Sequence, residues 1–265
     1  MPASPVSFAE MAVELIQTSE DAVLGGRLVL RQPLKGHRVG HDAILLAAAC
    51  SARPGETLVD LGAGVGAAGL AVVRRVADAV VTLVEIDPAL VALARDNVTR
   101  NGLAKRARVV CLDVGATSAA FASAGLPSAA ADHVLMNPPF NPAQNPSPDC
   151  GRRLAYAATD DTLATWLGAA ARLLCPAGTL TLIWRADGLG EVLAGLAADF
   201  GAVAVLPVHP KPEAAAIRVL VRAVKASRAP LSVLPGLILA DASGRPTAQA
   251  EDVLREGVAL PLAGN

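Results

Sequence analysis

Residues 57–66 read TLVDLGAGVG. The first half, Thr57–Leu61, is a short apolar run that predicts a buried strand. The apolar stretch that follows the second half predicts a helix. Between them stand Gly62, Gly64 and Gly66, and glycine permits both a tight turn and the close approach of a ligand to the backbone. A purely structural turn would need one glycine rather than three. The stretch therefore predicts a strand–turn–helix unit with a ligand at its turn.

Outward from this unit, strands and helices alternate along the chain. Further strands are expected at residues 80–86, 107–112, 132–136, 179–184, 202–207 and 216–224, and helices at 65–76, 88–101, 116–124, 160–174 and 188–200. A hairpin over residues 21–34, turning at Gly25-Gly26, and a short helix over 42–50 precede them. The pattern predicts an α/β fold with a doubly wound, mostly parallel sheet and an N-terminal hairpin extension. We expect residues 1–50 to form that extension and residues 51–265 to form the main domain, in one compact unit.

The composition narrows the class of protein. Hydrophobic residues make up 53% of the chain and the formal net charge is −1, so any nucleic-acid contact must come from local basic patches. The four cysteines are far apart and form no C-x-x-C pair, which argues against a disulfide framework and a zinc site. His37 and His41 have a helical metal-binding spacing but no third ligand, so no metal is expected. No apolar run is long enough to span a bilayer, and a cytoplasmic protein is expected.

Acidic residues stand at the ends of three consecutive predicted strands: Asp60, Glu85 (followed by Ile86) and Asp113. The segment 64–69 also matches the dinucleotide pattern G-x-G-x-x-G, and Glu85 is placed to accept hydrogen bonds from ribose hydroxyls. NAD and S-adenosylmethionine both fit these features. Asp60 favours S-adenosylmethionine, because a carboxylate repels a pyrophosphate but suits a sulfonium and an ammonium group. Asp113 is placed to accept from an adenine amino group, or else it is a helix N-cap before Val114.

The strand predicted at 132–136 runs into Asn137-Pro138-Pro139-Phe140. Two prolines stiffen the backbone, so the carbonyls of Asn137 and Pro138 and the Asn137 side-chain oxygen are held as acceptors. Fixed acceptors suit methylation of an aromatic amine, because hydrogen bonds to both N–H groups aim its lone pair at the methyl group. Phe140 offers a flat face on which a base can stack. The alternative is an ordinary loop with Phe140 in the core.

These motifs resemble those of Rossmann-like amino-methyltransferases: DLGAGVG (60–66), VEIDP (84–88), CLD (111–113) and NPPF (137–140). With QPLKGHRVGHDAILLAA (32–48), the chain also resembles the bacterial tRNA(Val) adenine-N6 methyltransferases. The resemblance implies a seven-stranded sheet whose last strand is antiparallel, S-adenosylmethionine as the cofactor, and catalytic roles for Asn137, Pro138 and Phe140. It implies cofactor contacts from Arg38, Asp42, Asp60, Gly62, Gly64, Glu85, Ile86, Asp113 and Asn137. Arg38 and Asp42 would lie near the cofactor's amino-acid end, or would only form a surface salt bridge within one helical turn.

The acceptor stays open at this point. Guanine N2 in rRNA and a protein glutamine are alternatives within the same chemistry. An NAD-dependent oxidoreductase and a non-catalytic RNA-binding module are more distant ones.

Local basic tracts are candidates for contacts with a tRNA or other RNA, by holding its phosphates. They comprise Arg27, Arg31 and Lys35 near the hairpin, Arg152 and Arg153 after the Pro-rich loop, and Arg218 and Arg222 in the last predicted strand. The alternative for each tract is a solvated polar face. Tyr156 and Trp166 are expected to pack in the core or in a lid rather than to stack on a base.

Overall fold

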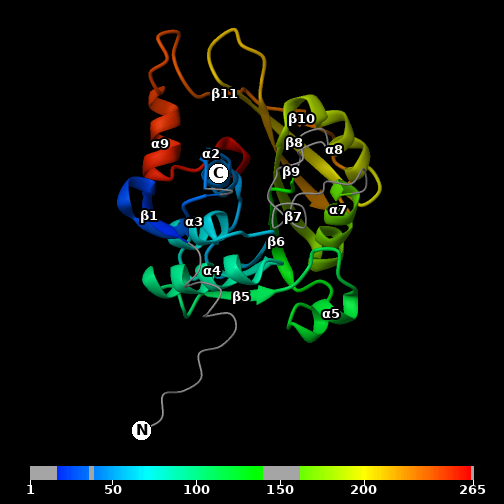
Figure 1. The fold of residues 1–265 in the computed structure, drawn as a ribbon. Coiled ribbons are helices and arrows are strands. Elements are labelled where there is room, and N and C mark those ends of the chain that lie inside the picture. Colours follow the sequence, from blue (N-terminus) through cyan, green and yellow to red (C-terminus); the bar gives the residue numbers. More distant parts are fainter. Residues whose placement is uncertain (1–16, 36–38, 140–161, 264–265) are drawn as a thin grey trace.

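The computed structural model describes residues 17–35, 39–139 and 162–263 of the chain. Its main sheet has nine strands in the order β10-β8-β9-β7-β6-β3-β4-β5, with β11 also paired to β8 (Figure 1). The strands are β3 (Thr57–Leu61), β4 (Val80–Glu85), β5 (Ala107–Cys111), β6 (Ala131–Met136), β7 (Leu174–Arg185), β8 (Phe200–His209), β9 (Arg218–Lys225), β10 (Ser232–Val233) and β11 (Leu237–Ile238). Strand β9 is antiparallel to both β7 and β8, whereas β3 to β7 are parallel to one another.

Helices cover both faces of this sheet and divide the core into two clusters (Figure 1). One cluster joins the sheet to α2 (His41–Ala49), α3 (Ala67–Arg75), α4 (Pro88–Arg100) and α9 (Ala248–Glu256). The other joins it to α5 (Ser118–Ser123), α7 (Thr162–Leu173) and α8 (Leu189–Leu196). Helices on both faces of a parallel sheet define the doubly wound α/β class, so the predicted fold class is confirmed.

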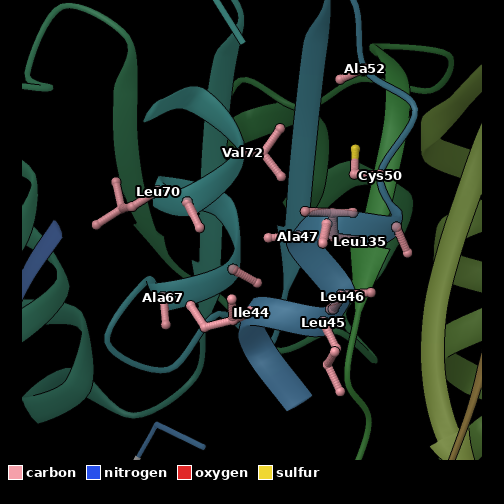
Figure 2. Close-up of a cluster of buried hydrophobic side chains, with 14 of the residues drawn as sticks. Ile44, Leu45, Leu46, Ala47, Cys50, Ala52, Ala67, Leu70, Val72 and Leu135 are labelled. Atoms are coloured by element: carbon pink, nitrogen blue, oxygen red, sulfur yellow. The ribbon is translucent and has the colours of Figure 1, made fainter. Parts of the chain in front are cut away.

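Helix α2 is part of the main core rather than an appendage. Its side chains from Ile44 to Ala49 are all buried, and Ile44 and Ala47 lie beside Ala67 and Leu70 of α3 in the same apolar cluster (Figure 2). A helix that is apolar on almost every side must be enclosed by other elements. The segment before the first strand of the sheet is thereby anchored in the core.

The hairpin of β1 (Thr18–Val23) and β2 (Leu28–Pro33) is held to α4 by two asparagine side chains. Asn97 accepts from the amide of Arg31 at 2.7 Å and donates to its carbonyl at 3.0 Å, and Asn101 makes the same two bonds to Val29 at 3.0 and 2.8 Å. Residues 29 and 31 are two positions apart in β2, so their backbone groups point to the same edge of the strand. The side-chain amides of Asn97 and Asn101 pair with that edge as a neighbouring strand would. Asn97 also donates to the carbonyl of Val65 at 3.0 Å, which ties the hairpin to the glycine turn.

We expect Asn97→Ala to lower the free energy of unfolding by about 2–4 kcal/mol, because it leaves buried backbone groups of residues 31 and 65 without their partner. Asn97 is completely buried. Urea unfolding measures the change. Thr99→Ala is the matched control, since the exposed Thr99 hydroxyl bonds only the carbonyl of Arg95 in its own helix. Equal stability of the two variants would contradict the bridging role.

The structure corrects the expected elements in the C-terminal half. Strand β7 begins at Leu174, whereas the sequence predicted a start at Thr179 because CPAG (175–178) is typical of a turn. The strand is longer because Leu174 pairs with Ala131 of β6, before a shift in the register of the two strands. The sheet has nine strands rather than seven, because β10 and β11 add two residues each beside β8. Such short strands exist through their pairing and leave no periodic pattern in the sequence. Helix α9, capped by Thr247, was not predicted either.

Among the described helices, none combines the length and the apolar character that crossing a membrane requires.

Candidate active site

The carboxyl ends of β6, β3, β4 and β5 lie next to one another in the sheet. Leu61, the last residue of β3, pairs with Met136 of β6 on one side and with Val84 of β4 on the other. Gly62 and Asn137 each follow one of these paired residues directly, so the glycine turn and the Asn-Pro-Pro segment lie side by side. Parallel sheets place ligand sites at this edge.

The turn after β3 has a backbone that only glycine adopts easily. The φ angles of Gly62, Gly64 and Gly66 are +65°, +56° and +91°. A Cβ added at Gly64 would meet nothing within 4 Å, so open space borders the turn there. The amide of Ala63 donates to the carbonyl of Val84 at 2.9 Å and closes the turn against β4. These features leave room for a ligand against the backbone.

Glu85 holds the turn from the next strand. Its Oε2 accepts from the amide of Gly64 at 2.8 Å, and its Oε1 accepts from the amides of Ile86 and Asp87 at 2.8 and 2.9 Å. The side chain is only 7% exposed. Because a carboxylate oxygen has two acceptor positions, Oε2 retains one for a further donor such as a ribose hydroxyl.

Asp60 lies under the turn and is almost completely buried, with 3% of its surface exposed. Its Oδ2 accepts from the amide of Gly69 at 2.8 Å. Burial is the main cause that raises the pKa of Asp60 to about 7; the Gly69 hydrogen bond lowers it, and the charge of Glu85 makes a smaller contribution that raises it. A cation placed beside such a carboxyl group stabilises its ionised form and lowers its pKa.

Asn137 carries an unused acceptor. Its Oδ1 is buried and has no hydrogen-bond partner among the described residues, while the neighbouring Pro138 is buried as well. A buried polar atom without a partner costs free energy, so its presence points to a ligand that supplies the missing donor. Phe140, the predicted stacking platform, lies outside the described residues.

Asp113 and Ile86 lie at the far end of the same edge. Asp113 is exposed, and its Oδ1 accepts from the amide of Gly115 at 2.8 Å within a turn. Helix α5 begins only at Ser118 with Thr117 as its cap, so the alternative of Asp113 as a helix N-cap is wrong. Ile86 is 47% exposed. An exposed carboxylate and an exposed apolar side chain suit the edge and the face of an adenine ring.

Asp42 is engaged by a residue that the sequence did not suggest. Its Oδ2 lies 3.0 Å from Nε of Arg218 in β9. Arg38 lies outside the described residues, so a pair within one helical turn is not tested.

Trp166 of α7, which the sequence predicted to pack in the core or in a lid, lies against the glycine turn, a contact that the sequence did not indicate. A Cβ at Gly62 would overlap its ring, with Cζ3 at 3.0 Å, so the indole rests directly on the glycine turn. Its neighbour Thr165 faces Gly115 beside Asp113. The two residues lie more than a hundred positions from Gly62, and no local pattern in the sequence indicates that α7 crosses this edge.

A cavity of about 420 Å³ lies away from this edge, near the C-terminal end of α3. It contains Arg27, Arg74 and Arg75 in its lining. All three arginines already donate to backbone carbonyls of the chain itself. The chemical groups at the strand ends therefore make the better candidate for the active site.

A family model described as the methyltransferase small domain matches residues 37–212, which contain the glycine turn, both buried carboxyl groups and Asn137. The chain belongs to the methyltransferase small domain family. The matched range includes every strand from β3 to β8.

Relatives of this chain agree with that family assignment. It is 30% identical over 165 residues to a tRNA1(Val) (adenine(37)-N6)-methyltransferase of Tolumonas auensis, an alignment that covers 62% of this chain and 65% of the relative. It therefore spans slightly less than two thirds of that protein. Its structure matches that of a predicted O-methyltransferase from Agrobacterium tumefaciens with a TM-score of 0.69 and 32% identity, covering 82% of this chain and 97% of the other.

A second solved structure, a Thermus thermophilus 16S rRNA guanine-N2 methyltransferase in complex with AdoMet and guanosine, matches with a TM-score of 0.55 and 20% identity. The match covers 79% of this chain and 50% of the other, and it shows the shared fold.

We expect Gly62→Ala to lower the free energy of unfolding of the protein by about 1–3 kcal/mol more than Gly102→Ala does. The two glycines have φ angles of +65° and +68°, so both substitutions add similar backbone strain of about 1–2 kcal/mol. Only the new Cβ at residue 62 overlaps Trp166, whereas the one at residue 102 meets nothing within 4 Å. Urea unfolding of both variants tests the contact, and equal losses would show that Trp166 moves aside freely.

Proposed function

We propose that this chain transfers the methyl group of S-adenosylmethionine to an exocyclic amino nitrogen, and that the acceptor is adenine N6 in the anticodon loop of a tRNA. The observation that carries the proposal is the buried, unpartnered Asn137 Oδ1 beside the glycine turn. The name of the Tolumonas auensis relative supports adenine in tRNA as the acceptor.

The residues at the strand ends fit S-adenosylmethionine. Asp60 supplies a buried negative charge for a cationic ligand, Glu85 keeps one acceptor position for a ribose hydroxyl, and Ile86 and Asp113 offer a face and an acceptor to the adenine ring. Gly62 and Gly64 allow the ligand to approach the backbone. When bound, the cofactor supplies an electrophilic methyl group on a positively charged sulfur.

Asn137 orients the acceptor in this proposal. Its Oδ1 and the adjacent backbone carbonyls accept from the amino N–H groups and favour the pyramidal nitrogen, whose lone pair then faces the methyl donor. The nitrogen becomes cationic when it accepts the methyl group, and it releases its proton to solvent afterwards, so no strong base is needed. An amide oxygen is not basic enough to deprotonate a hydroxyl, which favours nitrogen over oxygen as the acceptor at this residue. Pro138 keeps the segment rigid, and Phe140 is proposed to stack on the base.

The hairpin is the more favourable of the described candidate RNA surfaces. Arg27 and Arg31 lie there with the exposed Lys35. Arg27 contacts Glu256 and Arg31 lies near Asp96, but 50% and 35% of their side chains stay exposed. Arg222 in β9 is partly buried and donates to the carbonyl of Leu262, while Arg218 contacts Asp42, so these two are poorly placed for phosphates. Arg152 and Arg153 lie outside the described residues. A tRNA substrate would place the protein in the cytoplasm.

The deciding experiment compares total tRNA, rRNA and a peptide-chain release factor as methyl acceptors of the purified protein. Incorporation into tRNA, with N6-methyladenosine found by mass spectrometry of the nucleosides, is the expected result. N2-methylguanosine in rRNA, N5-methylglutamine in the protein or a methylated hydroxyl would each overturn the adenine assignment. A thermal shift with NAD and none with S-adenosylmethionine would overturn the reaction class.

A further inference from the structure

An aromatic ring stands on the turn at which the proposed cofactor contacts meet. The half-buried Trp166 places the benzene end of its indole against Gly62, with Cζ3 and Cζ2 at 3.0 and 3.3 Å from the position of a Cβ at that residue. Only a glycine accommodates this ring, since any Cβ at residue 62 would overlap it. The indole is therefore part of the wall beside the turn.

The other groups around Gly62 share one electrostatic property. Asp60, two residues earlier, is a buried carboxyl group, and Asn137 on the neighbouring strand holds an unpartnered amide oxygen. A carboxylate, an amide oxygen and the face of an indole all attract positive charge. A cation is therefore the ligand group that this end of the site fits best.

We propose that Trp166 turns the face of its indole toward the sulfonium end of S-adenosylmethionine, and that it thereby distinguishes the methyl-loaded cofactor from the product S-adenosylhomocysteine. The inference rests on the proposed function. The two compounds share the adenosine and the amino-acid groups, and they differ in the methyl group and in the positive charge on sulfur. An aromatic face attracts the charged form and gives the neutral thioether no comparable attraction.

The adenine ring is the other part of the cofactor on which an indole can stack. Its proposed contacts, Ile86 and Asp113, follow β4 and β5, and β5 lies two strands away from β3 in the sheet. Neighbouring strands are about 4.8 Å apart, so the strand ends that lead to Ile86 and Asp113 are roughly 5 and 10 Å from that of β3. The α7 residue that faces Gly115 beside Asp113 is Thr165, not Trp166. The position of Trp166 thus matches the sulfur end.

Calorimetric titration of Trp166→Leu with three ligands tests the proposal. We expect about tenfold weaker binding of S-adenosylmethionine, a similar loss for sinefungin, whose ammonium replaces the sulfonium, and less than about twofold change for S-adenosylhomocysteine. Trp166→Phe keeps a smaller aromatic face and should show an intermediate loss of affinity, again for the two cationic ligands only. This variant tests the proposal if the leucine variant folds poorly. An equal loss for all three ligands, or none, would overturn the contact.

Fluorescence supplies a second readout, because the chain has only two tryptophans. Trp184 in β7 is buried and lies against Gly188, so Trp184→Phe leaves Trp166 as the sole emitter and should bind the cofactor like the wild type. We expect its emission to change on titration with S-adenosylmethionine, and an unchanged spectrum at saturation would overturn the contact. A wild-type protein that binds neither compound would instead refute the proposed function itself.

Discussion

Asn137→Ala should reduce methyl transfer by on the order of a hundredfold or more, because it removes a fixed acceptor that is needed while charge develops on the amine. The dissociation constant of S-adenosylmethionine should change by less than about threefold. The variant should also be at least as stable as the wild type, since the lost oxygen has no partner in the folded chain. Single-turnover kinetics, calorimetry and urea unfolding measure the three quantities.

Thr181→Val is the matched control for this substitution. Thr181 lies in β7 with a completely buried hydroxyl oxygen that also has no partner among the described residues. Its replacement should likewise leave or raise stability, but methyl transfer should stay at the wild-type rate. Unchanged turnover of Asn137→Ala, or an equal loss in Thr181→Val, would refute the assigned role.

Asp60→Asn should stabilise the protein without cofactor and weaken cofactor binding at the same time. Burial is the main cause that raises the folded-state pKa of Asp60 from 3.8 to about 7, so ionising this carboxyl costs the folded chain stability as the pH rises from about 4 to 7. A shift of about three pKa units corresponds to at most about 4 kcal/mol. Asparagine stays neutral and still accepts from Gly69, but it offers a sulfonium no charge. We expect the affinity for S-adenosylmethionine to fall by roughly ten- to a hundredfold.

The pH dependence of this effect has a defined sign. Below about pH 4 the carboxyl of Asp60 is protonated in both the folded and the unfolded chain, so Asp60→Asn and the wild type should be equally stable. Between about pH 4 and pH 7 the folded chain retains the proton that the unfolded chain loses, so the stability of the wild type falls as the pH rises. The advantage of the variant should grow through this range and level off above it.

Asp132→Asn provides the opposite case for comparison. Hydrogen bonds from the amide and hydroxyl of Thr57, at 2.9 and 2.7 Å, lower the pKa of Asp132, which lies at the other end of β6. This variant should lose stability above its pKa and bind the cofactor normally. Thermal unfolding at pH 5 and pH 8 separates the two variants, and a destabilised Asp60→Asn at pH 8 would contradict the cost assigned to the buried charge.

The local sequence determined the elements and the composition of the site. Thr57–Leu61 is a strand with the bounds expected from its apolar run, and the three glycines after it all adopt positive φ angles. Asp60, Glu85 and Asn137 fall at strand ends because the strands between turns are short and apolar, and a parallel arrangement then gathers those ends at one edge. Periodicity and turn chemistry are local properties, so a sequence displays them.

Tertiary structure decided what each of these groups contacts. Only the fold shows that Glu85 binds the Gly64 amide, that Asn97 joins the hairpin to the glycine turn, that Asp42 contacts Arg218 and that Trp166 rests on Gly62. The two-residue strands beside β8 are likewise products of pairing rather than of pattern. These contacts join residues that are distant along the chain, and their free energy arises from packing and burial, which no window of neighbouring residues contains.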